Sequence, residues 1–193
     1  MLGLNNSMLH QETLVQGLVH SYSSDFTSSV DGWEGWSIQG SLTLASNTNP
    51  YDDLGGSAPD SDGWLKVTYD TNQTNSSGLQ TYFGWPSGGN PVTGGNQSGD
   101  YHIFGFTIYI VDDSGKWGSS PPITIKIYPH SSPAIDVDVP LDTATTVSGL
   151  LTSSINTGVP PNCHWAFQIP ADMPQAGAVY YVKDINQETF GVR

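Results

Sequence analysis

Short hydrophobic runs alternate with clusters of Gly, Pro, Ser, Thr and Asn along most of this chain. In Ile123–Tyr128 the alternation is clean, because every second residue is isoleucine, and this period of two predicts a strand with one face on a core. The run Ile103–Val111 is apolar on both faces, which predicts a strand in the middle of a sheet. No helical period of ten residues follows residue 21, so the pattern predicts an all-β chain.

About eleven such runs, joined by turn residues, indicate an antiparallel β-sandwich of two sheets. The turn Asp112–Gly115 is predicted to close a hairpin, with Gly115 at positive φ. Loops 47–63 and 86–99 are long enough to carry function or motion. The predicted strands are Tyr22–Phe26, Gly35–Ile38, Leu42–Ala45, Trp64–Tyr69, Gly78–Phe83, Tyr101–Val111, Ile123–Tyr128, Ala134–Val139, Thr145–Leu151, His164–Ile169 and Val179–Ile185, with a short final strand at Thr189–Val192.

Charge narrows the choice of partner. Five Lys and Arg residues stand against 18 Asp and Glu residues, for a formal net charge of −13. Nucleic acid and anionic membrane surfaces are therefore excluded as expected partners, since both are bound mainly through Lys and Arg. The charge suits solubility, cation binding or a solvent-facing place on a large assembly.

Residues 1–21 precede the first predicted strand. They contain no Lys or Arg and no continuous apolar run, so they do not have the pattern of a secretory signal peptide. We predict an N-terminal arm over residues 1–21 that contacts a partner chain, followed by one sandwich domain over residues 22–193. An extra edge strand or a disordered terminus is the alternative for the arm.

Two segments at opposite ends of the chain resemble a known family. Ser24–Trp33 contains an Asp-Phe pair followed by Gly-Trp, and Gly177–Ile185 contains Tyr-Tyr followed by Asp-Ile. Together they resemble the opening and closing strands of carbohydrate-binding modules with a galactose-binding-like jelly roll. The resemblance implies a jelly-roll β-sandwich whose first and last strands are adjacent.

Sugar rings are bound by flat aromatic side chains, because an indole ring packs on the apolar face of a pyranose, and this chain has six tryptophans. Trp85 borders the Gly-rich loop and Trp117 follows the turn at Asp112–Gly115, so these two are the predicted ligand-binding residues. Burial under a loop or in a subunit interface is the alternative for both. The other four, at the starts of predicted strands, are expected in the core: Trp33, Trp36, Trp64 and Trp165.

The resemblance also implies a calcium ion where the first and last strands meet. The matching carboxylates here are Asp25 or Asp31 near the start and Asp184 near the end. Their hard oxygen atoms suit Ca²⁺. Thr27 and Lys183 depart from the family pattern, and the alternative is that these aspartates cap turns.

Catalysis has little support in the sequence, which contains only three Glu and no nucleophile-elbow, zinc-protease or phosphate-loop motif. No catalytic residue is predicted. The expected function is a non-enzymatic accessory protein on the surface of a bacteriophage virion, as a capsid decoration, head-fibre or tail component. Its expected partners are capsid or tail proteins, further copies of itself and a cell-surface glycan. The alternative is a carbohydrate-binding module of a polysaccharide-active enzyme.

Overall fold

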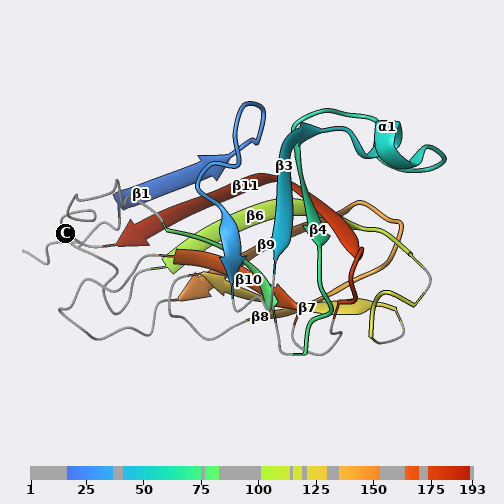
Figure 1. Ribbon diagram of the computed structural model, residues 1–193. Helices are drawn as coiled ribbons and strands as arrows, with labels where there is room; N and C mark the ends of the chain where they lie inside the picture. Colours follow the sequence, from blue (N-terminus) through green and yellow to red (C-terminus); the bar gives the residue numbers. More distant parts are fainter. Residues whose placement is uncertain are drawn as a thin grey trace, which may run out of the picture.

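Two antiparallel sheets pack face to face in the computed structural model (Figure 1). It describes residues 17–36, 41–74, 77–82, 101–113, 115–118, 121–129, 135–152, 164–169 and 174–191. The six-stranded sheet runs in the order β3 (Leu42–Thr48), β4 (Trp64–Tyr69), β11 (Val179–Gly191), β6 (Tyr101–Ile110) and β9 (Thr145–Thr152), with β1 (Gly17–Ser24) paired to β11. The five-stranded sheet runs β2 (Glu34–Trp36), β5 (Ser77–Tyr82), β10 (His164–Ile169), β7 (Ile123–Pro129) and β8 (Ile135–Val139).

The predicted antiparallel β-sandwich is confirmed, and so is the adjacency of its terminal strands. Strand β1 lies antiparallel beside the C-terminal half of β11, with Ser24 opposite Ile185. The N-terminal half of β11 pairs with β4 instead, and β6 lies along its other edge. A register shift between Lys183 and Asn186 interrupts the β6 ladder. The last strand therefore holds the six-stranded sheet together.

The first strand begins earlier than the sequence pattern predicts. Gly17 already pairs with Gly191, and residues 17–21 form the first part of β1. Residues 17–21 therefore belong to the sandwich rather than to a separate arm. This agrees with the alternative given above, in which the arm forms an extra edge strand. The sequence shows no regular alternation of apolar and polar residues here, because Gly17 has no side chain and the strand is irregular between Leu18 and His20, where its register shifts. Residues 1–16 lie outside the described residues.

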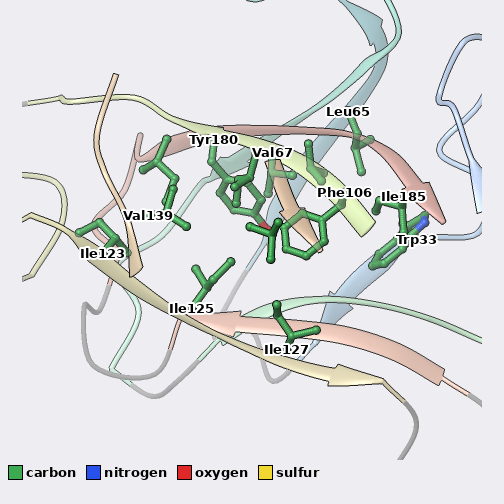
Figure 2. Packing of buried hydrophobic residues seen from close by; sticks show 14 of the residues in the cluster. Trp33, Leu65, Val67, Phe106, Ile123, Ile125, Ile127, Val139, Tyr180 and Ile185 are labelled. Carbon is green, nitrogen blue, oxygen red and sulfur yellow. The ribbon is translucent and has the colours of Figure 1, made fainter. Parts of the chain in front are cut away.

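The core fills the space between the sheets (Figure 2). Ile123, Ile125 and Ile127 are fully buried, which confirms the strand alternation predicted for β7. Strand β6 is paired on both sides and supplies four core residues from alternate positions, so its predicted central place is also confirmed. The six-stranded sheet contributes Leu65, Val67, Tyr69, Phe104, Phe106, Ile108, Ile110, Val147, Tyr180, Val182 and Ile185 to this cluster.

Two connections differ from the prediction. Asp112–Gly115 does not close a hairpin, because β6 and β7 belong to different sheets and this segment starts the crossing between them. Gly115 does take a positive φ, of 90°. Loop 47–63 contains a short helix, α1 (Pro50–Leu54), whose N-cap Asn49 accepts a hydrogen bond from the Tyr51 backbone N–H. No helix among the described residues has the length and apolarity needed to cross a membrane.

Candidate functional site

The predicted ligand-binding tryptophans do not form an exposed platform in the part of the chain that the structure describes. Trp117 is only 6% exposed and packs in the core against Tyr69, with the two ring centroids 6.4 Å apart. Its indole N–H donates to the Val111 carbonyl at 2.8 Å. Trp117 is therefore a buried packing residue, which is the alternative given for it above. Trp85 lies outside the described residues.

The aspartates predicted to hold calcium are engaged in the turn after β1. One carboxylate oxygen of Asp25 accepts from the backbone N–H and the hydroxyl of Thr27, at 3.1 and 2.9 Å. These two hydrogen bonds, the backbone one foremost, lower the pKa of Asp25. Asp31 accepts from the Ser29 hydroxyl at 2.5 Å and from the Phe26 backbone N–H at 3.4 Å. Both aspartates cap the turn that leads to the buried ring of Trp33.

The three predicted ligands do not gather into one metal centre. Asp184 stands at φ 54°, with its carboxylate 3.7 Å from the ammonium of Lys183. Across the described ranges, no group of three His, Cys, Asp or Glu side chains is placed to hold a metal ion. As placed here, these side chains do not form a calcium site of their own.

One outer face of the sandwich is closed over its aromatic residues. Trp64, Tyr109 and Tyr181 lie on the outer side of the six-stranded sheet and are at most 3% exposed. The α1 segment, residues 49–63, packs over them through Ala58. The indole N–H of Trp64 donates to the Ser61 hydroxyl at 3.1 Å. These rings support the cover and offer no surface for stacking.

A charged group fixes this cover to the sheet. Asp53 of α1 accepts from the Lys66 ammonium at 2.8 Å and from the Tyr181 hydroxyl at 2.7 Å. The Lys66 hydrogen bond foremost, with the Tyr181 hydroxyl, holds the pKa of Asp53 below its usual value although burial opposes this. Burial foremost, with the Asp53 carboxylate, raises the pKa of Tyr181. The Asp53 carboxylate thus links the α1 segment to two residues of the sheet.

The outer face of the five-stranded sheet carries a different set of side chains. On β7, Thr124 and Lys126 alternate with the core isoleucines and are half-buried. Their partners on β8 are exposed: Asp138 accepts from the Thr124 hydroxyl at 2.8 Å, and Asp136 lies 3.7 Å from the Lys126 ammonium. Glu34, on the far edge strand β2, is exposed as well.

The backbone register extends these positions into rows across the whole sheet. Backbone pairing places Trp36 opposite Gly78, Gly78 opposite Gln168, and Gln168 opposite Lys126. The row ends at Asp136, the β8 partner of Lys126. Directly paired residues of an antiparallel ladder share a face. This row of positions therefore belongs to the face on which Lys126 and Asp136 are accessible.

A second row runs parallel to the first. It consists of Glu34, Gln80, Ala166 and Tyr128, each paired with the next across β2, β5, β10 and β7. The two rows bring aromatic, amide and carboxylate residue types onto one face, which we call the rowed face. This face was not predicted from the sequence, because Trp36 was expected in the core and the paired residues are far apart along the chain. The detectable signal was the alternation Glu34–Gly35–Trp36, which places residues 34 and 36 on the same side of a strand.

Comparison with known proteins supports the architecture. No protein-family model matches the sequence, and no curated protein matches it either. Among solved structures, the chain is similar to the C-terminal family 22 carbohydrate-binding module of Clostridium thermocellum Xyn10B, with 15% identity and a TM-score of 0.51 over 89% of this chain and 95% of that one. It is also similar to an arabinose-bound α-L-arabinofuranosidase, MgGH51, with 10% identity and a TM-score of 0.51. That match covers 82% of this chain and only 23% of the enzyme.

At these identities the two likenesses establish the fold: this chain is a β-sandwich of the kind found in carbohydrate-binding modules. They do not transfer a ligand. The function has to be argued from the residues of the rowed face.

Proposed function

We propose that this protein is a non-catalytic carbohydrate-binding module that holds a polysaccharide chain across the outer face of its five-stranded sheet. The observation that supports the proposal is the row Trp36–Gly78–Gln168–Lys126–Asp136, with Glu34 and Gln80 in the row beside it. It spans all five strands of the sheet, so it suits an extended chain better than a single small molecule.

The residue types in these rows match what a sugar offers. A pyranose has apolar C–H faces, which pack on aromatic rings, and hydroxyl groups, which hydrogen-bond with amides and carboxylates. The glycine at position 78, opposite Trp36, adds no side chain of its own to the row. The covered aromatic cluster at Tyr181 offers no comparable surface on the opposite side of the molecule.

Binding without turnover fits the carboxylates better than hydrolysis does. A glycosidase needs a pair of carboxyl groups, one of which has a raised pKa and acts as an acid. Among the described carboxyl groups with a shifted pKa, Asp25 and Asp53 are both shifted downward. On the rowed face, Asp136 is engaged with Lys126 and Asp138 with Thr124.

Two functions were expected from the sequence: a component of a virion and, as the alternative, a carbohydrate-binding module. We adopt the alternative. The sandwich is shared with a protein described as a carbohydrate-binding module, and this likeness supports the alternative. Association with a virion surface, capsid or tail partners and a homo-oligomeric state stay predictions, which co-sedimentation with particles and sedimentation velocity would test.

Affinity electrophoresis in gels that contain soluble xylan, mixed-linkage glucan or galactomannan tests the proposal. We expect at least one of these polymers to retard the native protein. Trp36→Ala should weaken that binding about two- to tenfold, since one aromatic contact contributes roughly 0.5–1.5 kcal/mol. Thr146→Ala, an exposed position on the opposite sheet, is the control and should bind as the native protein does. Undiminished retardation of a folded Trp36→Ala variant would overturn the assignment of this face.

A further inference from the structure

We propose that the rowed face selects uncharged polysaccharides and rejects those that carry carboxylate or sulfate groups, and that Asp136 sets this selectivity. The inference rests on the proposed function and names the substrate class of the same site. Its basis is the way in which the few cations of this chain are distributed.

Every lysine of the protein lies beside an aspartate. Lys66 is 2.8 Å from Asp53, while Lys126 and Lys183 are each 3.7 Å from their partners. Lys116 pairs with Asp113 three residues earlier. The only other basic residue apart from histidine, Arg193, lies outside the described residues. An anionic sugar therefore meets no lysine whose charge is not already balanced.

The net charge of the described side chains on the rowed face is negative. Its described charged side chains are Glu34, Asp136, Asp138 and Lys126, so three carboxylates stand against one ammonium. The carboxylate of Asp136 is the more accessible partner of the ion pair, with its side chain 59% exposed against 35% for Lys126. A ligand that approaches from solvent thus meets the negative member of the pair first.

This arrangement discriminates by repulsion. Sugar hydroxyls can donate hydrogen bonds to carboxylates without electrostatic repulsion. A neutral chain can therefore use Glu34, Asp136 and Asp138 as acceptors. A uronate or sulfate group has to compete with Asp136 for Lys126 and to lie close to like charges. The net charge of −13 adds repulsion at longer range, which salt screens.

Matched polymers with the same backbone provide the test. Binding of the native protein is measured by affinity electrophoresis on hydroxyethyl cellulose against carboxymethyl cellulose, and on methyl-esterified against de-esterified pectin, at low and high ionic strength. We expect the neutral member of a pair to bind roughly tenfold more tightly at low salt, with the ratio shrinking at high salt. Equal binding of both members at low salt would overturn the selectivity and leave glycan binding intact. Absence of binding to any neutral polymer would instead remove the proposed function.

The role of Asp136 is tested by a gain of binding. Asp136→Asn keeps the shape of the side chain and releases Lys126, so binding to the anionic member should rise about five- to tenfold at low salt. Asp113→Asn is the matched control, because it makes the same change in net charge and releases Lys116, whose ammonium contacts the Gly177 carbonyl beside β4 of the other sheet. If both variants gain equally, net charge rather than Asp136 determines the selectivity. If neither gains, Asp136 is not the determinant.

Discussion

At the scale of single residues, Gly149 is the described glycine with the least room for a side chain. A Cβ atom at this position would lie 2.8 and 2.9 Å from two ring atoms of Phe104, a core side chain that is 2% exposed. The ring lies against Gly149 from the adjacent strand β6. It cannot move away without disturbing the packing around it.

We therefore expect Gly149→Ala to lower the free energy of unfolding by about 1–3 kcal/mol, the usual cost of overpacking a core. Urea denaturation followed by tryptophan fluorescence measures the loss. Gly105→Ala is the matched control: the three atoms nearest to its Cβ would all belong to the side chain of Asn186, the first at 3.2 Å, and Asn186 is exposed and can shift. A loss in Gly149→Ala no greater than that in Gly105→Ala would contradict this account of the packing.

Individual residues were predictable where one local rule decided their environment. The alternation at Ile123, Ile125 and Ile127 correctly identified the core face, since neighbouring side chains of a strand point to opposite sides. Trp117 was harder, because its burial depends on the path by which the chain leaves β6 for the other sheet. Turn composition does not reveal that path. The same limit applies to Asp112–Gly115, which has hairpin residues without forming a hairpin.

At the scale of elements, the α1 segment depends on Asp53. Its hydrogen bonds with Lys66 and Tyr181 hold the folded-state pKa below that of the unfolded chain. A depressed carboxyl pKa stabilises the fold above the unfolded pKa, near 3.9, and that contribution disappears as the pH falls through the folded-state value. The cover over Trp64 and Tyr181 should therefore loosen in acid.

Unfolding measured between pH 7 and pH 2 tests this dependence. We expect Asp53→Asn to be less stable than the native protein at pH 7, and the difference between them to shrink below about pH 4. Asp52→Asn removes the same charge from an adjacent exposed position of α1 and serves as the matched control, which should cost less stability at pH 7 than Asp53→Asn. A constant difference between Asp53→Asn and the native protein at every pH would show that ionisation of Asp53 does not matter.

Among the elements, strands with strong boundaries were predicted best. The bounds of β4 and β10 agree with the sequence pattern, because Gly and Pro or polar clusters flank both runs. The helix α1 was missed, since its five residues are too short to show a helical period. Its start could have been detected from Asn49 followed by Pro50, an N-cap with proline at the first helical position.

At the scale of the whole molecule, the sequence predicted the sandwich and the meeting of its ends but not the rowed face. Trp36, Gln168 and Lys126 come from three separate parts of the chain, and only the order of strands in the sheet aligns them. Strand order depends on the packing of the whole domain, which a local pattern does not contain. The resemblance at the two chain ends concerns β1 and β11 of the six-stranded sheet, so it predicted the fold but carried no information on the face of the other sheet.

The meeting of the chain ends also bears on calcium, because Asp25 follows β1 and Asp184 lies in β11 beside it. Thr27, Ser29 and Phe26 already donate to the carboxylates of Asp25 and Asp31, so the turn is satisfied by the protein itself. We therefore expect the melting temperature to be the same in EDTA and in excess Ca²⁺. An ion held only by the native state would add RT ln(1 + [L]/Kd), about 2.7 kcal/mol at a hundredfold excess over Kd, which a melting curve detects readily. A fall in melting temperature in EDTA that Ca²⁺ reverses and Mg²⁺ does not would show that calcium displaces these turn contacts.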